Sequence, residues 1–357
     1  MKYDWKLLKY PDDSVAIKEF LDLVISNSPN LPANNRWQFI FPILDLFFSE
    51  KWCVFATLEI DSRAICALPI VTSEQSKFLI NWTEIGFPKH SHINFIEIGI
   101  EDVETALKDL ATVISKENDQ WHRLCFRNVH SSKLAEREYT GDCAWFSTDQ
   151  GKSINEVVSK KHVRNTRRLK NRLIDRFDEP QLIVSNEDRL IDLEDFVRVE
   201  ECSWKGKQGV AISSDENLMQ LYSDIATSFS KTEFVIFKLI VNKKVISTAL
   251  GFHLGNTLYL HKVSFDPEYA EYAPGNILLL ELITKAIIDP GISSINLINK
   301  PAWSKRWHPN TARLGNFTFY NHKVTSSLLR LIIAYWRQSK KWAKKLKINN
   351  LRDSLVR

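Results

Sequence analysis

Long apolar segments are missing from this sequence of 357 residues. The apolar run Phe39–Leu44 is followed at once by Asp45, whereas a membrane-spanning helix needs about 20 apolar residues. The first residues, MKYDWKLLKYPDD, also lack the apolar stretch of a secretory signal. We therefore expect a cytoplasmic protein without a transmembrane helix.

Cysteine motifs are missing as well. The five cysteines are an odd number and none of them forms a CxxC pair, which argues against a disulfide framework or a zinc knuckle. We therefore expect no metal.

The composition, 44% hydrophobic and 25% charged, excludes wholesale disorder, collagen and a coiled coil. The length favours two domains and also fits one large domain.

Acidic residues are scarce in two segments. Residues 160–176 contain eight Lys or Arg and one Asp, and residues 323–357 contain ten and one. The rest of the chain carries 30 basic and 41 acidic residues. Two basic segments therefore belong to an otherwise acidic protein, which favours local contacts with anions over a protein that coats nucleic acid.

The first 145 residues have the pattern of a mixed α/β domain. Apolar residues recur at helical spacing over 15–26 and 103–117. Strands are expected at Trp52–Leu58, Ala64–Val71 and Leu124–Phe126.

The second half predicts an antiparallel meander. Two short turns, Asn242–Lys244 and Gly255–Asn256, separate three β-rich segments. These segments are Phe234–Val241, Val245–Leu254 and Thr257–Phe265. The other elements expected here are helices at Asn155–Phe177, 189–203 and Ile277–Ile288, and a strand at Ile292–Ile298.

Several short motifs accompany this order of elements. A basic segment, Lys160–Leu169, precedes the meander, and so does Glu200–Gly206. Tyr259–Lys262 lies on the third strand of the meander. The remaining motifs follow the meander, and they are Asp266–Ala270, Tyr272–Leu279 and Lys305–Trp307.

This series resembles the GNAT acetyltransferase subfamily labelled CelD/BcsL-like or BioF2-like, which is related to the Fem aminoacyl transferases. The resemblance covers residues 150–310 well and the first half in outline. It implies an α/β (α+β) fold of two GNAT-like domains, each with a mixed central sheet flanked by helices. We expect these domains at 1–150 and 151–322, with a basic amphipathic tail at 323–357. It also implies acyl transfer in polysaccharide or cell-envelope biosynthesis.

The phosphate-binding turn departs from the usual pattern. Typical GNAT enzymes have Arg/Gln-x-x-Gly-x-Gly/Ala where backbone N–H groups hold the pyrophosphate of CoA. Here the stretch Glu271–Asn276 contains a single glycine, Gly275. The donor is therefore acetyl-CoA or another acyl-CoA held differently, or another activated acyl carrier. Fem enzymes use aminoacyl-tRNA, which keeps tRNA open as a donor.

Acyl transfer needs a proton acceptor and a stabilising group for the oxyanion. His261 lies on the strand that lines a GNAT-type active site, and its alternative is a histidine packed on the sheet. His261 and Lys262 point to opposite faces if the strand is regular. In the Fem-like families a lysine at the position of Lys305 contacts a phosphate or the oxyanion, and its alternative is a surface lysine.

Other residues are expected to bind donor or acceptor. The helix before the meander ends at Glu201, Trp204 and Lys205, which could frame the acceptor. We expect Glu201 to be a catalytic residue. For Trp204 alone we favour a core tryptophan. The remaining candidates for donor or substrate binding are Tyr272, Gly275, Asn276 and Trp307.

The basic helix presents arginines on one face. Arg164, Arg167, Arg168 and Arg172 follow the spacing i, i+3, i+4 and i+8, and guanidinium groups suit phosphate oxygens. The face is a solvated surface, a site for the phosphates of a small ligand (with Arg164 and Arg168 as its binding residues), or a tRNA site. The acidic remainder of the chain favours the small ligand.

The tail at 325–347 interleaves apolar and aromatic residues with lysines and an arginine. This composition is typical of a helix that lies on an anionic membrane surface, here the inner membrane, and equally of a terminal helix docked on its own domain.

We interpret the chain as an acyltransferase that moves an acyl group from acyl-CoA to an amine or hydroxyl of a sugar or envelope precursor. One alternative is a Fem-like transferase that uses aminoacyl-tRNA. The other is a catalytically silent GNAT-fold protein that binds a partner in a polysaccharide assembly system.

Overall fold

The structure of the protein is a computed structural model. This structure describes residues 3–77, 80–88, 100, 102–130, 134, 138–185, 188–336, 338 and 339. Residues 337 and 340–357 of the expected tail thus lie outside the described residues, and its residues 324–336 form a helix.

The first half alternates strands and helices. Its elements are β1 (Trp5–Lys9), α1 (Ser14–Asn27), η1 (Ala33–Asn35), α2 (Trp37–Phe48), β2 (Cys53–Ile60), β3 (Arg63–Lys77), β4 (Ile80–Gly86), α3 (Val103–Glu117), β5 (Arg123–His130) and β6 (Tyr139–Ser147).

The second half contains the meander and most of the helices. Its elements are α4 (Ile154–Val157), α5 (Lys160–Ile174), β7 (Gln181–Ser185), α6 (Arg189–Cys202), α7 (Trp204–Lys207), η3 (Ile212–Ser214), α8 (Glu216–Ser228), β8 (Phe234–Val241), β9 (Lys244–Leu254), β10 (Thr257–Phe265), η4 (Pro267–Tyr272), α9 (Pro274–Ile288), β11 (Ser294–Asn296), η5 (Ala302–Trp307) and β12 (Asn310–Tyr320).

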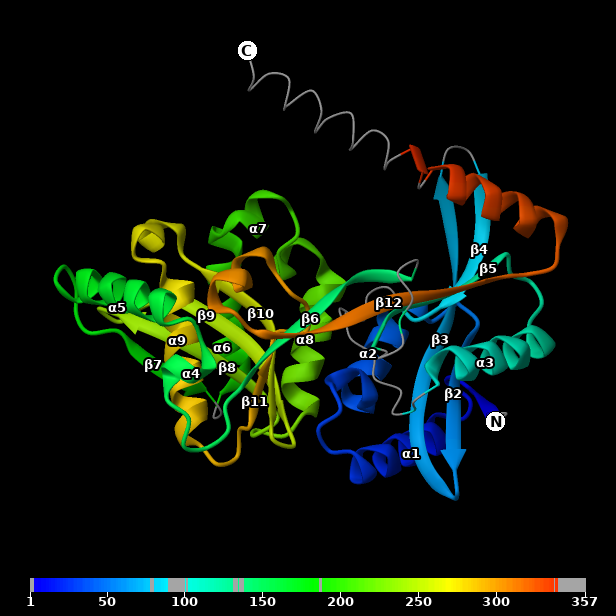
Figure 1. The fold of residues 1–357 in the computed structure, drawn as a ribbon, viewed down its shortest axis with the longest axis horizontal. Helices are drawn as coiled ribbons and strands as arrows, with labels where there is room; N and C mark the ends of the chain where they lie inside the picture. Colours follow the sequence, from blue (N-terminus) through cyan, green and yellow to red (C-terminus); the bar gives the residue numbers. More distant parts are fainter. Residues whose placement is uncertain are drawn as a thin grey trace, which may run out of the picture.

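All these strands form one mixed sheet of 12 strands in the order β1-β2-β3-β4-β5-β12-β6-β11-β10-β9-β8-β7. Parallel pairing occurs between β4 and β5 and between β10 and β11. The long strand β12 pairs with β5 on one edge and β6 on the other, and Figure 1 shows it running between the two halves. The expected α/β fold with a mixed sheet and flanking helices is confirmed. The expected domain boundaries stay a prediction.

Two layers of helices cover the second half of the sheet. One core joins α6 and α8 to alternate residues of the meander such as Ile236 and Leu250. The other core joins α9 to the intervening residues such as Phe237 and Ala249. Because side chains alternate across a strand, α6 and α8 cover one face of the sheet and α9 covers the other.

Most of the expected elements are present. The helix at 103–117 and the three strands of the meander are confirmed within one residue. The expected helix Asn155–Phe177 is instead two helices, because Val158 and Ser159 have extended or non-helical backbone and separate α4 from α5. The expected strand Ile292–Ile298 is shortened to β11. α8 and β12 are among the elements that the sequence patterns did not indicate.

Candidate active site

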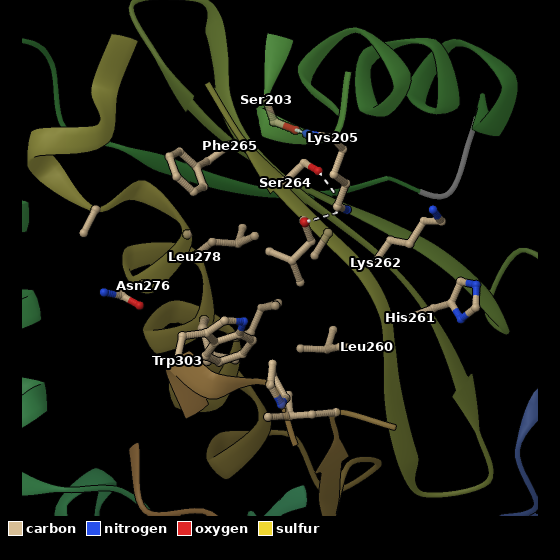
Figure 2. Close-up of a pocket in the computed structure, with 18 of the residues that line it drawn as sticks. Ser203, Lys205, Leu260, His261, Lys262, Ser264, Phe265, Asn276, Leu278 and Trp303 are labelled. Carbon is tan, nitrogen blue, oxygen red and sulfur yellow. Dashed lines mark hydrogen bonds between the residues drawn. The ribbon is translucent and has the colours of Figure 1, made fainter. Parts of the chain in front are cut away.

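A cleft of about 690 Å³ opens beside β10. The parallel pairing of β10 with β11 ends at Tyr259 and Asn296. The residues beyond this point, Leu260–Phe265 of β10 and Leu297–Asn299 after β11, line the cleft. Leu278, Leu279 and Leu282 of α9 complete an apolar wall. In Figure 2, Leu278 and Trp303 lie on one side of β10, and His261 and Lys262 lie on the other. The cleft therefore gives access to both faces of the sheet.

A β-bulge in β10 shapes the cleft. Leu260 pairs with Gly251 of β9, but Lys262 already pairs with Leu250, so His261 is the extra residue. The close approach of the two strands requires glycine at position 251, because a Cβ there would lie 2.5 Å from the carbonyl oxygen of Tyr259. The strand is therefore not regular, and both His261 and Lys262 line the cleft.

A fully buried carboxylate lies behind the bulge. Glu200 of α6 accepts hydrogen bonds from Nζ of Lys205 (2.8 Å) and of Lys262 (3.5 Å) at Oε1, and from the backbone N–H of Ile212 (2.8 Å) at Oε2. Burial works to raise the pKa of Glu200, but the two cations and the hydrogen bonds outweigh it and lower the pKa. Glu200 is therefore an anion at neutral pH.

The two lysines share this single carboxylate. Nζ of Lys205 also donates to the carbonyl of Val263 and to Oγ of Ser264, as the dashed lines in Figure 2 show. Nζ of Lys262 donates to Glu200 and lacks the two additional oxygen acceptors that Lys205 has among the described residues. Burial lowers its pKa, the Glu200 charge opposes this change and the Lys205 charge adds to it. The site therefore holds one cation more than its anion balances.

Tyr222 of α8 connects the same group to His261. Its hydroxyl lies 2.9 Å from Nε2 of His261, and its ring lies 5.5 Å below the ammonium of Lys262. Burial raises the pKa of Tyr222 well above its ordinary value, and the charge of Glu200 adds to this effect. Tyr222 therefore keeps its proton. The imidazole of His261 contacts Phe39 and Phe252 edge-on, which fixes its plane.

Two exposed tryptophans border the cleft. Trp204 of α7 is 57% exposed and Trp303 of η5 is 43% exposed, and both line the cleft. Ser203 caps α7 by accepting from the N–H of Lys205. Gly206 allows α7 to pack on α6, because a Cβ there would lie 1.9 Å from the carbonyl oxygen of Glu201. The indole of Trp204 is thus held at the cleft by a short, close-packed helix.

The N-terminus of α9 also faces the cleft. Ala273 precedes it in the left-handed conformation, Pro274 occupies its first turn, and Gly275 and Asn276 line the cleft. The first N–H groups of a helix attract anions, and Pro at this position removes one N–H that would have no partner.

Six of the expected site residues come together in the cleft, and these are Trp204, Lys205, His261, Lys262, Gly275 and Asn276. Four others lie away from its lining. Glu201 and Lys305 are exposed, on α6 and η5. Tyr272 and Trp307 are buried, and the ring of Trp307 packs edge-on against His162.

Two residues of the site, Glu200 and Tyr222, were not among those expected from the sequence. Glu200 could have been found, because it follows Leu193 and Phe196 at helical spacing and so faces the core, whereas Glu201 is turned outward. Tyr222 belongs to α8, which was not predicted.

The expected arginine face divides into separate environments. Lys160, Lys161, Arg164 and Arg167 line a second hollow of about 470 Å³ together with Asn155 and Val163. Arg168 instead donates to Oδ1 of Asn165, and Arg172 pairs with Glu271 at 3.1 Å. Four cations therefore line the hollow, and two of them, Arg164 and Arg167, belong to the expected face of four arginines.

Two further features concern metals and membranes. Among the described residues, no group of three or more His, Cys, Asp or Glu is arranged to hold a metal ion. None of the helices in the described ranges has the length and apolar character needed to cross a bilayer.

Comparison with known families and structures identifies the fold. Residues 160–301 match the family model described as acetyltransferase (GNAT) domain. No curated protein matches the chain. The fold is similar to the crystal structure of FemX, with a TM-score of 0.58, 11% identity, and coverage of 92% of this chain and 99% of that one.

Two other solved structures are similar. The C-terminal domain of a putative lysylphosphatidylglycerol synthetase from Agrobacterium fabrum has a TM-score of 0.53 and 11% identity, and covers 88% of this chain and 96% of that one. A conserved protein of unknown function from Bacteroides thetaiotaomicron has a TM-score of 0.50 and 14% identity, with 86% and 96% covered. The chain therefore has a GNAT-type fold like that of FemX, and the domain match supports an acyltransferase.

Proposed function

We propose that the protein transfers an acyl group from an acyl-CoA to an amine or hydroxyl of a sugar or cell-envelope precursor. The observation that carries this proposal is the cleft that connects the N-terminus of α9, on one face of the sheet, to the His261–Tyr222 pair and Lys262 on the other. A donor on the first side and an acceptor on the second could meet at β10.

The residues of the cleft fit acyl-CoA as the donor. The N–H of Gly275 and the side-chain amide of Asn276 suit the phosphates, since the backbone N–H of Asn276 itself donates to the carbonyl of Ala273. The apolar side chains of Leu260 and Leu278 suit the flexible arm that carries the thioester. Acyl-CoA, when bound, supplies the activated carbonyl that the acceptor attacks.

His261 is the proposed proton acceptor. Imidazole is the side chain that most often serves as a general base near neutral pH. Tyr222 keeps its own proton and lies at hydrogen-bond distance from Nε2, so it orients the imidazole for the acceptor's amine or hydroxyl.

Lys262 is the proposed stabilising group for negative charge on the carbonyl oxygen. Its side chain is mostly buried, and its carboxylate partner Glu200 is shared with Lys205 at a shorter distance. A cation in a water-poor site stabilises developing charge more strongly than one in water. Lys305, exposed on η5, is proposed to contact a phosphate of a bound substrate.

The two tryptophans favour an acceptor with a ring. Exposed indoles are costly in water and are typical of binding sites, and Trp204 and Trp303 both line the cleft. The apolar face of a sugar ring could stack on such an indole while its amine or hydroxyl approaches His261.

A thiol-release assay tests the proposal. The chain is mixed with acetyl-CoA or a longer acyl-CoA and with an amino sugar, and free CoA is measured against the same sugar without its amine. We expect release that depends on the acceptor. Release without dependence on any sugar or amine acceptor would contradict the proposed acceptor class.

A second candidate function rests on the basic hollow at α5. Four cations around one hollow also suit the backbone of a tRNA, as in a Fem-like transferase. The affinity for tRNA should then fall with salt by about 0.7–0.9 log units per log unit of salt for each contacted phosphate. Each of Arg164→Ala and Arg167→Ala should flatten that slope by about one unit. Failure of tRNA to compete with acyl-CoA would favour the first function.

A further inference from the structure

An exposed apolar stripe runs along the helix at 324–336. Val324, Leu328, Leu331 and Tyr335 are 85%, 58%, 67% and 77% exposed. Their spacing of four, three and four residues places them on one face of the helix. Single exposed apolar residues are ordinary, but a contiguous stripe of this kind marks an interaction surface.

The opposite face of this helix is already docked on the protein. Leu329 and Ser326 are buried, and the guanidinium of Arg330 lies 6.0 Å from the ring centroid of Tyr320 at the end of β12. The exposed stripe is therefore the side left over after docking. Figure 1 shows the helix at the end of the molecule remote from α9, so the stripe is separate from the cleft.

The sequence that follows supplies charge of one sign. Residues 337–357 contain eight Lys or Arg and a single Asp. An apolar helical face continued by basic residues has the chemistry of a helix that lies at the surface of a bilayer with anionic lipids. A second copy that docked through the same face would bring its own basic segment to that face and be repelled. We propose that the face formed by Val324, Leu328, Leu331 and Tyr335 docks on an anionic lipid surface.

Vesicle co-sedimentation of the full chain tests this proposal. We expect binding to vesicles of phosphatidylglycerol and phosphatidylcholine, and at least tenfold weaker binding to phosphatidylcholine alone. Replacing Lys340 and Lys341 by Gln should weaken binding by about fivefold per charge, because each basic residue near such a surface adds a similar increment. Equal binding to neutral vesicles, or none to anionic ones, would overturn the proposal.

A pair of variants tests the stripe itself. Leu328→Glu with Leu331→Glu should weaken binding at least tenfold, because both lose apolar contact and add repulsion. The matched control is Leu190→Glu with Ile191→Glu, two exposed apolar residues at the start of α6, which should bind as the wild type does. Circular dichroism verifies that both variants are folded. Unchanged vesicle binding by the stripe variant would overturn the proposal. So would a wild type that binds no vesicles and forms a dimer that the stripe variant loses.

Discussion

At the scale of single residues, the site depends on one buried carboxylate that serves two lysines. Glu200 accepts from Lys205 at 2.8 Å and from Lys262 at 3.5 Å. Lys205 has two further oxygen partners, so it is the better-satisfied ammonium. Lys262, whose pKa is lowered, is therefore stabilised less by the folded protein than Lys205 is. A negative charge that develops on the substrate would accordingly stabilise Lys262 more than Lys205.

Lys262→Met should separate activity from stability. A lysine whose folded pKa lies below its unfolded pKa destabilises the folded state at every pH below the unfolded pKa, which includes neutral pH. We therefore expect an unchanged or higher Tm together with a loss of about 10²–10³-fold in kcat/KM. The control is Lys285→Met, an exposed lysine in the last turn of α9. A lower Tm with full activity would reject this role for Lys262.

Glu200→Gln should destabilise the protein in a pH-dependent way. Removing one partner of a buried ion pair costs about 3 kcal/mol, the lower end of the usual range, because both lysines retain some access to water. The folded pKa of Glu200 lies below its ordinary value of 4.5. Its contribution is therefore complete above pH 4.5 and is lost as the pH falls through the lower folded pKa.

Urea unfolding of Glu200→Gln and wild type at several pH values measures this difference. The exposed neighbour provides the control, since Glu201→Gln should leave the free energy of unfolding unchanged. A gap between wild type and Glu200→Gln that stays constant down to pH 2 would contradict the assignment.

At the scale of elements, the bulge in β10 organises the site. It brings His261 and Lys262 to one cleft although they are adjacent on a strand, and bulges of this kind re-aim side chains near active sites. The bulge depends in turn on Gly251 of β9, where the neighbouring backbone leaves no room for a Cβ.

Gly251→Ala should therefore impair both the fold and the site. The new methyl group meets backbone and not a flexible side chain, so we expect the free energy of unfolding to fall by about 1–3 kcal/mol. We also expect kcat to fall by a larger factor than the factor by which KM changes. Gly141→Ala on β6 is the control, because a Cβ there meets nothing within 4 Å. Thermal unfolding and steady-state kinetics measure both effects, and wild-type values for Gly251→Ala would argue against the bulge as the organising element.

The elements differ in how far the sequence predicts them. The meander is predictable because its turns are local: Asn242, Lys243 and Gly255 have positive φ, and these positions mark tight turns in the sequence. β12 is not predictable in this way, because its partners β5 and β6 lie about 170–200 residues earlier. His261 and Lys262 were found from their place on a predicted strand, whereas Tyr222 required the packing of α8 against β10.

At the scale of the whole molecule, the two halves are joined in two ways. β12 connects β5 to β6 within one sheet. A single core also contains Ile17 and Phe39 from the first half with Phe196 and Ile225 from the second. The two halves therefore share one of their cores, while each also packs a core that lies mostly within its own residues.

Unfolding should consequently be cooperative. Scanning calorimetry of the full chain should give one transition, because loss of either half exposes the shared core of the other. Residues 151–357 expressed alone should be unfolded or insoluble, since they lack α1 and α2. Two well-separated transitions, or a stable fragment with native circular dichroism, would show that the halves are independent.

The central claim, that the N-terminus of α9 holds the phosphates of an acyl-CoA, is tested most directly by calorimetric titration of acetyl-CoA into two variants at one position. Ala273 has the left-handed conformation, which Asn and Asp both tolerate, so Ala273→Asn and Ala273→Asp differ in charge and not in shape. We predict binding by the wild type and the Asn variant, and about tenfold weaker binding by the Asp variant because its charge repels the phosphates. Equal affinities of the Asn and Asp variants, or no binding by the wild type, would contradict the claim.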